Sequence, residues 1–295
     1  MRPRPVIPGT TYLITRGCID QRFLLLPSRA VEEVVLYCVA VAASSTGVVV
    51  HALTVMSNHY HAVTSDPFGR APEFYGWVNE FVAKALNCSY GRSGPFWQPN
   101  VPTSRVELID DDAVVDKVAY AAANPVLSRL VSRGELWSGV RLYRPEMRVV
   151  ARPSVFFRED GDLPKTAILH IVAPKLASSR SESETLERID SAVLAKEAAA
   201  RDEASREGKR FVGLRRLRRQ TIHDTPLTKR ARFGMSPGVA SRNKWLRLER
   251  LRQCRQWLAD HRAASKQWRE GARDVVFPFG TYAMVRFHAV AVASP

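Results

Sequence analysis

The stretch Met56-Ser57-Asn58-His59-Tyr60-His61-Ala62-Val63 decides the fold of the first half of this chain. Apolar and mostly β-branched residues lead into it from Val48 and continue beyond its histidines, a composition typical of β-strands. The polar pair Ser57-Asn58 separates the two runs and is short enough for a two-residue hairpin turn. The stretch therefore predicts two antiparallel strands joined by a hairpin.

Two histidines occupy alternate positions of the second strand. Side chains two residues apart in a strand project from the same face, so His59 and His61 are expected on one face and Tyr60 on the other. Two imidazoles side by side on a rigid strand are a ready pair of metal ligands. The same spacing also arises when two polar residues lie on a half-exposed strand, so the pattern alone leaves both interpretations open.

Further elements surround this hairpin. The hydrophobic pattern predicts strands at residues 9–16, 48–56, 59–64 and 101–108, and helices at residues 28–43 and 72–90. Ser28 is the expected N-cap of the first helix, and Pro72 stands in the first turn of the second. This order is the split β-α-β arrangement. We therefore expect an α+β fold, with a ferredoxin-like antiparallel sheet and helices on one face.

A third helix is predicted from Asp110 to Asn124, ending before Pro125. Tyr120 and Asn124 are four residues apart on it and share a face. A tyrosine phenolate can attack a phosphodiester, and a divalent cation would stabilise the charge of the transition state. Two imidazoles and the Asn124 amide suit Mg²⁺ or Mn²⁺. Alternatively, Tyr120 is a buried aromatic anchor and Asn124 merely ends the helix.

Charge divides the 295-residue chain into two regions. The formal net charge is +15, and the first 150 residues carry 15 basic and 13 acidic side chains against 29 and 16 in the remainder. A concentrated excess of positive charge indicates a polyanionic partner, for which nucleic acid is the best candidate. We expect an α+β domain at residues 1–148 and a basic, mainly helical accessory region that binds DNA at residues 149–295.

Candidate DNA contacts lie in two segments of the basic region. They are Lys209, Arg210, Arg215, Arg216, Arg218, Arg219 and Arg247. Arg247 belongs to an amphipathic helix predicted at residues 243–261. Trp245 and Trp257 lie on the apolar stripe of this helix, and we expect them to pack into a core rather than stack on unpaired bases.

Cysteine usage and the N-terminus bear on the compartment. Cys18, Cys38, Cys88 and Cys254 are scattered without a paired motif, which argues against a disulfide framework and predicts a reducing cytoplasm. No apolar run follows Met1, so no signal peptide is predicted. Residues 34–56 lack charged side chains, but the polar residues 44–47 divide them into a helix and a strand, so no membrane partner is expected.

These residues together resemble the HUH single-strand endonucleases, in their single-tyrosine transposase branch and especially the REP-associated tyrosine transposases. The resemblance covers residues 8–145 and rests on the order and spacing of several stretches. These are Gly9-Thr10-Thr11-Tyr12-Leu13-Ile14-Thr15-Arg16-Gly17, Asn58-His59-Tyr60-His61, Phe96-Trp97-Gln98, Tyr120-Ala121-Ala122-Ala123-Asn124-Pro125-Val126 and Leu136-Trp137-Ser138. Three alanines replace the bulkier residues common between the tyrosine and the asparagine, which predicts a more loosely held helix.

The resemblance implies a definite activity. His59, His61 and Asn124 would bind Mg²⁺ or Mn²⁺, and Tyr120 would become linked to a DNA 5′ phosphate, leaving a free 3′ hydroxyl. The implied substrate is single-stranded DNA, often beside an imperfect hairpin. A different class of function stays open, a catalytically silent protein that binds DNA hairpins and regulates. A homodimer is also left open, because some members of the family exchange helices between subunits.

Overall fold

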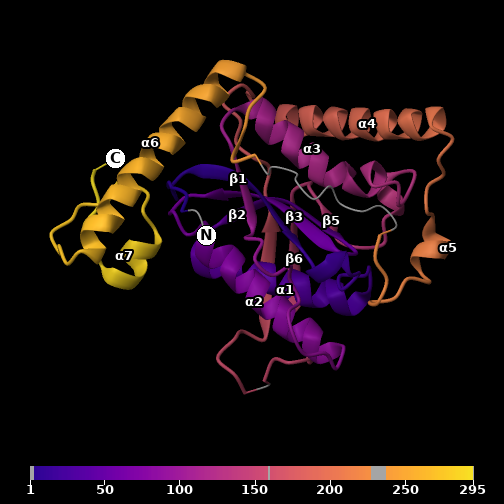
Figure 1. The fold of residues 1–295 in the computed structure, drawn as a ribbon. Helices are drawn as coiled ribbons and strands as arrows, with labels where there is room; N and C mark the ends of the chain where they lie inside the picture. Colours follow the sequence, from indigo (N-terminus) through magenta and orange to yellow (C-terminus); the bar gives the residue numbers. More distant parts are fainter. Residues whose placement is uncertain (1–2, 159, 227–236, 295) are drawn as a thin grey trace.

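The computed structural model describes residues 3–158, 160–226 and 237–294 and arranges them around one large sheet (Figure 1). The longer helices are α1 (Arg29–Thr46), α2 (Ala71–Ser89), α3 (Asp111–Leu127), α4 (Glu182–Arg206) and α6 (Lys244–Arg269), with short helices α5 (Leu214–Leu217) and α7 (Ala283–His288). The strands are β1 (Thr10–Gly17), β2 (Val49–Met56), β3 (His59–Asp66), β4 (Ser104–Leu108), β5 (Arg141–Leu142), β6 (Glu146–Ala151), β7 (Thr166–Ile171) and β8 (Val239–Ala240).

The centre of the sheet has the predicted topology. Its order is β6-β7-β2-β3-β1-β4-β8, and the four central strands β2, β3, β1 and β4 are antiparallel to one another where they pair. Ser57 and Asn58 form the turn between β2 and β3, which confirms the predicted hairpin. Within this sheet, the short outer contacts of β2 with β7 and of β4 with β8 are parallel.

Helices cover both faces of the sheet, which corrects one part of the predicted fold. The α+β class is confirmed, and α1 and α2, inside the split β-α-β repeat, lie together on one face. However, α3 and α4 cover the opposite face, where α3 packs on Leu13, Ala52 and Val63. The alternation of β1, β2 and β3 places apolar side chains on both faces, so each face needs a covering layer.

The apolar segment at residues 34–56 lies in the core, as predicted. Most residues of α1 from Val34 to Ala42 are buried, and β2 is buried along almost its whole length. The Ser28 side chain accepts from the amide of Val31 at the start of α1, and Gly47 ends the helix in the left-handed conformation. In the part of the chain that the structure describes, no helix is both long and apolar enough to cross a bilayer.

Helix α3 is longer and more firmly held than expected. Asp110 caps it, accepting from the amide of Ala113, and the helix passes through Pro125 to Leu127 instead of stopping before the proline. A proline within a helix removes one hydrogen bond, which the packing of the last turn outweighs. Ala121, Ala122 and Ala123 are fully buried. Their small side chains let α3 lie close between the sheet and α4, so the prediction of a loosely held helix is wrong.

The chain beyond residue 148 continues the first region. The predicted boundary at 148/149 falls inside β6, and β6 and β7 extend the central sheet beside β2. The long helix α4, which Ser181 caps, packs along α3. Ion pairs join these helices from Lys196 to Asp116 and from Arg188 to Asp112. Helix α4 therefore supports the helix that carries Tyr120.

A buried ion pair connects α4, β5 and α3. Arg141 Nη2 lies 3.2 Å from Glu197 Oε1, and the two side chains are 11% and 4% exposed. Arg141 Nε also donates to the carbonyl oxygen of Ala122 at 2.7 Å. The pair thus holds the helical turn between Tyr120 and Asn124.

We predict that Glu197→Ala lowers the free energy of unfolding by about 3–5 kcal/mol, because it leaves Arg141 buried without its carboxylate. The measurement is urea denaturation. Glu203→Ala is the matched control on the same helix, since Glu203 is exposed and 3.8 Å from Arg129. It should change stability by less than about 1 kcal/mol. Equal losses in the two variants would contradict a buried clamp.

Candidate functional site

The candidate site lies on the sheet face that α3 covers. His59 and His61 project from this face of β3, while Tyr60 projects from the other, as predicted. The two imidazole rings are 4.8 Å apart between centroids, at an angle of 79°. His61 is opposite Thr15 of β1 and Thr54 of β2 in the strand register. The sheet therefore surrounds His61 with polar side chains on a buried surface.

Helix α3 brings Tyr120 and Asn124 to the same imidazole. The ring of Tyr120 lies 5.2 Å from that of His61 between centroids, edge to face at 68°. Asn124 Nδ2 lies 3.3 Å from His61 Nε2. His61 and Asn124 are buried, while Tyr120 and His59 are half-buried. All four predicted site residues thus come together within one chain, from two elements about sixty residues apart.

Hydrogen bonds fix the orientation of both histidines. His61 Nδ1 is 2.7 Å from Thr15 Oγ1, and His59 Nδ1 is 2.7 Å from Asn58 Oδ1. With the proton on Nδ1, His61 donates to Thr15 and accepts the Asn124 amide at Nε2, so one tautomer satisfies both contacts. Metal-binding histidines are commonly held in this way through the nitrogen that does not bind the metal.

The donor set fits a divalent cation held by imidazole nitrogen and neutral oxygen. His59 and His61 supply nitrogens. Asn124 turns its amide nitrogen toward His61 and its oxygen toward Ser128, so it would supply the oxygen after its amide rotates. Thr54 Oγ1 is buried in register with His61 and has no hydrogen-bond partner among the described residues. An unsatisfied buried hydroxyl costs free energy unless a ligand or water meets it. The described residues contain no group of three or more His, Cys, Asp or Glu side chains suited to a metal.

A charged network lies one turn before Tyr120. Lys117 Nζ is 5.7 Å from the centroid of the Tyr120 ring. Asp116 accepts hydrogen bonds from Lys117 at 2.8 Å and from Lys196 at 2.7 Å. Burial raises the pKa of Asp116, but these two hydrogen bonds outweigh it and bring the pKa below its ordinary value. Asp116 therefore stays ionised between the two lysines, and the network keeps one formal positive charge beside the tyrosine, where an anionic substrate would approach.

The other face of β3 serves packing. Tyr60 lies edge to face with Trp97, 5.8 Å between ring centroids, and its hydroxyl donates to Asn79. Burial raises the pKa of Tyr60, so this hydroxyl is a poor source of a phenolate. Trp97 donates to the Asn79 carbonyl, and Trp137 donates to the Val55 carbonyl. Both tryptophans of the motif-like stretches therefore support the sheet and lie outside the His61 cluster.

His51 takes no part in the cluster. A β-bulge interrupts the register between Val50 and Ala52, and His51 lies opposite the far end of β3. Its two ring nitrogens contact the Val172 carbonyl at 2.7 Å and Ser65 Oγ at 2.8 Å. Burial lowers its pKa, which favours the neutral ring. His51 is therefore a structural residue that joins β2 to β3 and to the residue after β7.

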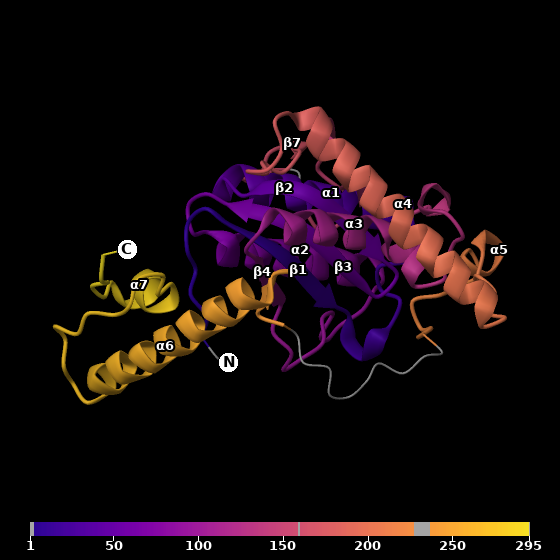
Figure 2. The same cartoon turned by 90° about the horizontal axis from the view of Figure 1, so that it is seen from above.

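The predicted basic DNA contacts separate into two places. The segment with Lys209, Arg210, Arg215, Arg216, Arg218 and Arg219 is exposed around α5, beside the C-terminal end of α3. Its backbone donates from Val212 to Arg129 and from Gly213 to Leu130. Arg247 lies instead near the start of α6, which begins beside β4 and extends away from α5 (Figure 2). Only the α5 segment is therefore beside the candidate site.

The sequence did not single out three further residues. Thr15 orients His61, Thr54 places a hydroxyl under α3, and Arg141 holds the Ala122 carbonyl. Strand alternation within the predicted opening strand could have placed Thr15 on the histidine face. The partner of Arg141 lies 56 residues away on α4, so that contact has no local signal.

Part of the chain is similar to a solved structure. No family model matches the chain, and no curated protein matches it. The structure of a REP-associated tyrosine transposase bound to a REP hairpin is similar, with 16% sequence identity and a TM-score of 0.39. The match covers 46% of this chain and 79% of that one. A likeness at this level does not establish a family, so the function proposed below rests on the site geometry.

Proposed function

We propose that this protein is a metal-dependent transesterase that cleaves and rejoins single-stranded DNA beside a hairpin, in the manner of the HUH single-tyrosine transposases. One observation carries the proposal. His61 of β3 contacts both Tyr120 and Asn124 of α3, which are 59 and 63 residues away in the chain. A nucleophile, an amide and two imidazoles meeting at one buried surface are the groups that this reaction needs.

In the proposed reaction, Tyr120 is the nucleophile. Its oxygen attacks the phosphorus of a DNA phosphodiester, and the hydroxyl proton passes to water. The bond between phosphorus and the 3′ oxygen breaks, and that oxygen takes up a proton to become a free 3′ hydroxyl. The 5′ phosphate stays on Tyr120, so attack by a 3′ hydroxyl reverses the step and joins the strands. Bound through His59, His61 and Asn124, Mg²⁺ or Mn²⁺ would stabilise the developing negative charge.

The protein surface would hold the substrate near this site. Lys117 places a cation beside the Tyr120 ring, and the exposed arginines around α5 lie at the same end of the sheet. Phosphate contacts of this kind supply most of the affinity of proteins for DNA without reading its sequence. We propose that the α5 segment binds the strand or the hairpin next to the cleavage point.

A second candidate function is a catalytically silent protein that binds DNA hairpins. The buried cluster argues for the enzyme, because hairpin binding alone needs no tyrosine beside a histidine pair.

Since all four residues of the cluster belong to one chain here, catalysis requires no exchange of α3 between subunits. A homodimer stays a prediction, and so does a cytoplasmic location. Among the described residues, none of the four cysteines forms a disulfide.

We predict that Tyr120→Phe abolishes formation of a covalent protein–DNA product, because it removes the attacking oxygen. The substrate is a pool of labelled hairpins with randomised single-stranded flanks, incubated with Mn²⁺. Denaturing gel electrophoresis then separates covalent product from free strands. Tyr75→Phe is the matched control, since Tyr75 belongs to α2 on the opposite face of the sheet.

Three outcomes of this experiment distinguish the enzyme with Tyr120 as nucleophile from its alternatives. Covalent product from the wild type and from Tyr75→Phe, but not from Tyr120→Phe, would support the enzyme. Equal cleavage by Tyr120→Phe would show that another nucleophile acts. Hairpin binding by the wild type without any cleavage would favour the silent protein.

We predict that Thr15→Val weakens Mn²⁺ binding by about 10- to 100-fold, because His61 loses the hydroxyl that orients its ring. Isothermal titration of the free protein with MnCl₂ measures this without any DNA. Thr11→Val is the matched control on the same strand, since the Thr11 hydroxyl contacts Ser65 instead. Equal affinities of the two variants would contradict a metal at His61, and so would unchanged binding in His59→Ala.

A further inference from the structure

The C-terminal part of the chain forms an arm with its own small core. One face of α6 packs on the segment that follows it. Leu258 of α6 is buried, and so are Val275 and Phe277 of that segment. Trp257 is half-buried and donates to the Phe279 carbonyl at 2.7 Å, and its ring stacks near that of His261. From Trp257 onward, the inner face of α6 is therefore covered by this lobe.

Several contacts fix this arm to the body of the protein. Arg250 donates to Glu107 of β4 at 2.8 Å, in a largely buried ion pair. The amide of Val6 donates to the Gly280 carbonyl at 2.9 Å, and Tyr282 donates to Glu73 of α2 at 3.1 Å. The arm therefore projects from the sheet in a defined direction (Figures 1 and 2).

The outer face of α6 is a basic stripe. Lys244, Arg255, Arg262 and Lys266 are exposed, and their spacings of 11, 7 and 4 residues return to the same side of a helix. The stripe is about 33 Å long at 1.5 Å per residue. The whole helix has eight basic and two acidic side chains. Among the described residues, only Lys266 of the four forms an ion pair, with Glu270 at 3.8 Å.

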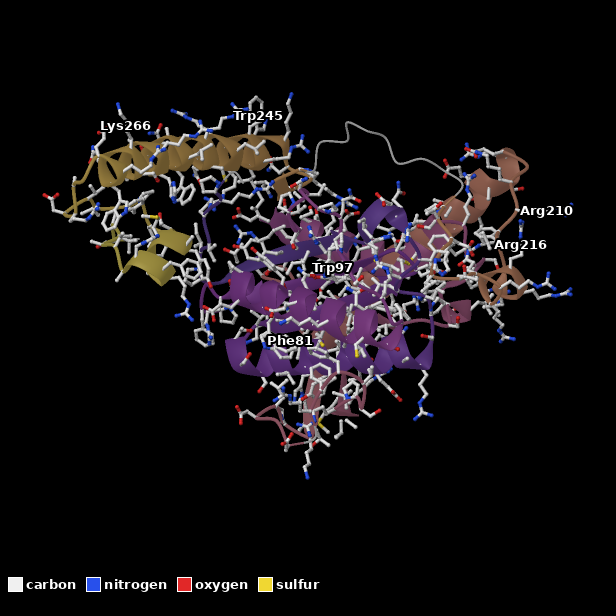
Figure 3. All side chains as sticks on the ribbon, turned by 60° about the horizontal axis from the view of Figure 1, so that its bottom comes forward. Phe81, Trp97, Arg210, Arg216, Trp245 and Lys266 are labelled. Atoms are coloured by element: carbon white, nitrogen blue, oxygen red, sulfur yellow. The ribbon has the colours of Figure 1, made fainter. Side chains whose placement is uncertain are left out.

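Trp245 marks the start of this stripe and departs from the sequence prediction. We expected it to pack into a core, but it is 75% exposed and points away from the body, on the same side as Lys266 (Figure 3). Lys244 Nζ is 5.8 Å from the centroid of its ring. The lobe covers the apolar residues of α6 from Trp257 onward. The first turns of the helix, which carry Trp245, have no covering element, so Trp245 stays exposed.

We propose that the outer face of α6 is a second DNA-binding surface, which takes duplex DNA through its phosphates. Cationic side chains on one face of a long helix can neutralise several phosphates of a duplex. The length of the stripe is close to one turn of B-form DNA, about 34 Å. Helix α6 extends away from β3, the strand of His61, and from α5 (Figure 2). Duplex binding by α6 therefore does not depend on cleavage by Tyr120.

The chemistry of this face favours double-stranded DNA over two other nucleic acids. Proteins that bind single strands stack successive bases on several aromatic side chains, whereas Trp245 is the one tryptophan on the outer face of α6. Duplex RNA has a deep and narrow major groove that side chains do not enter. The major groove of B-form DNA, about 12 Å wide, accepts an α-helix with its side chains.

The test removes the stripe and measures binding to a 20-base-pair DNA of random sequence by fluorescence anisotropy. The variant carries Lys244→Gln, Arg255→Gln, Arg262→Gln and Lys266→Gln. We expect roughly 100-fold weaker binding at 0.15 M salt, and a salt dependence of log K that is shallower by about 3 to 4, since each phosphate contact contributes about 0.9. All four side chains are exposed, so thermal unfolding should be unchanged.

A matched variant separates a specific surface from overall charge. It removes four other exposed charges with Arg158→Gln, Lys165→Gln, Lys175→Gln and Arg180→Gln. This variant should lose little duplex affinity and keep the wild-type salt dependence. Equal losses in both variants would overturn the proposal. A larger loss of affinity in the stripe variant for the matching RNA duplex or single strand than for the DNA duplex would overturn it too. Because the assay contains no Mn²⁺ and scores no cleavage, failure of the proposed enzymatic function would leave its outcome unaffected.

Discussion

The two-residue alternation of β3 is the constraint on which the rest of this structure depends. It sends Tyr60 into the layer of α1 and α2 and sends His59 and His61 to the opposite face. That second face also carries Leu13 and Val63, which are apolar and need cover. Helix α3 supplies the cover, and its passage over β3 brings Tyr120 and Asn124 to His61. The candidate site is thus a consequence of how the sheet buries its second face.

Firm support of α3 is what makes such a site usable. Catalytic groups need to be held within a fraction of an ångström of their working positions. Three buried alanines let α3 approach the sheet closely, while α4 covers its other side. The Arg141–Glu197 pair holds the turn between Tyr120 and Asn124 from outside. The part of the chain beyond residue 148 therefore contributes to the site as a support, although none of its residues joins the cluster.

Much of this arrangement was predictable from sequence, because its signals are local. The hairpin at Ser57-Asn58, the cap at Ser28 and the alternation of the histidines each depend on a few adjacent residues, and the structure agrees with them. The layer in which α3 lies depends instead on contacts between distant segments, so the helices were expected on one face. Trp245 was misjudged for a similar reason. Helical periodicity shows a stripe, but only the tertiary structure shows where the covering lobe ends.

For the charged residues too, part of the arrangement was predictable from sequence and part depends on the tertiary structure. Composition located the positive charge in the second half of the chain, but it could not show that α5 and α6 would lie at opposite ends. The position of α5 follows from Leu217 and Phe211, which pack beside Met56 and Val126. The position of α6 follows from Arg250, Glu107 and the pairing of β8 with β4. Two separate basic surfaces suit a protein that holds a duplex in one place and acts on a strand in another.

A crystal structure of the protein soaked with Mn²⁺, with anomalous diffraction data, tests the central claim most directly. We expect one strong anomalous peak about 2.1 Å from a ring nitrogen of His59, a ring nitrogen of His61 and the amide oxygen of Asn124, with the Tyr120 hydroxyl turned toward it. No peak at this position in crystals that bind Mn²⁺ elsewhere would contradict the account, as would a Tyr120 side chain directed away from the histidines.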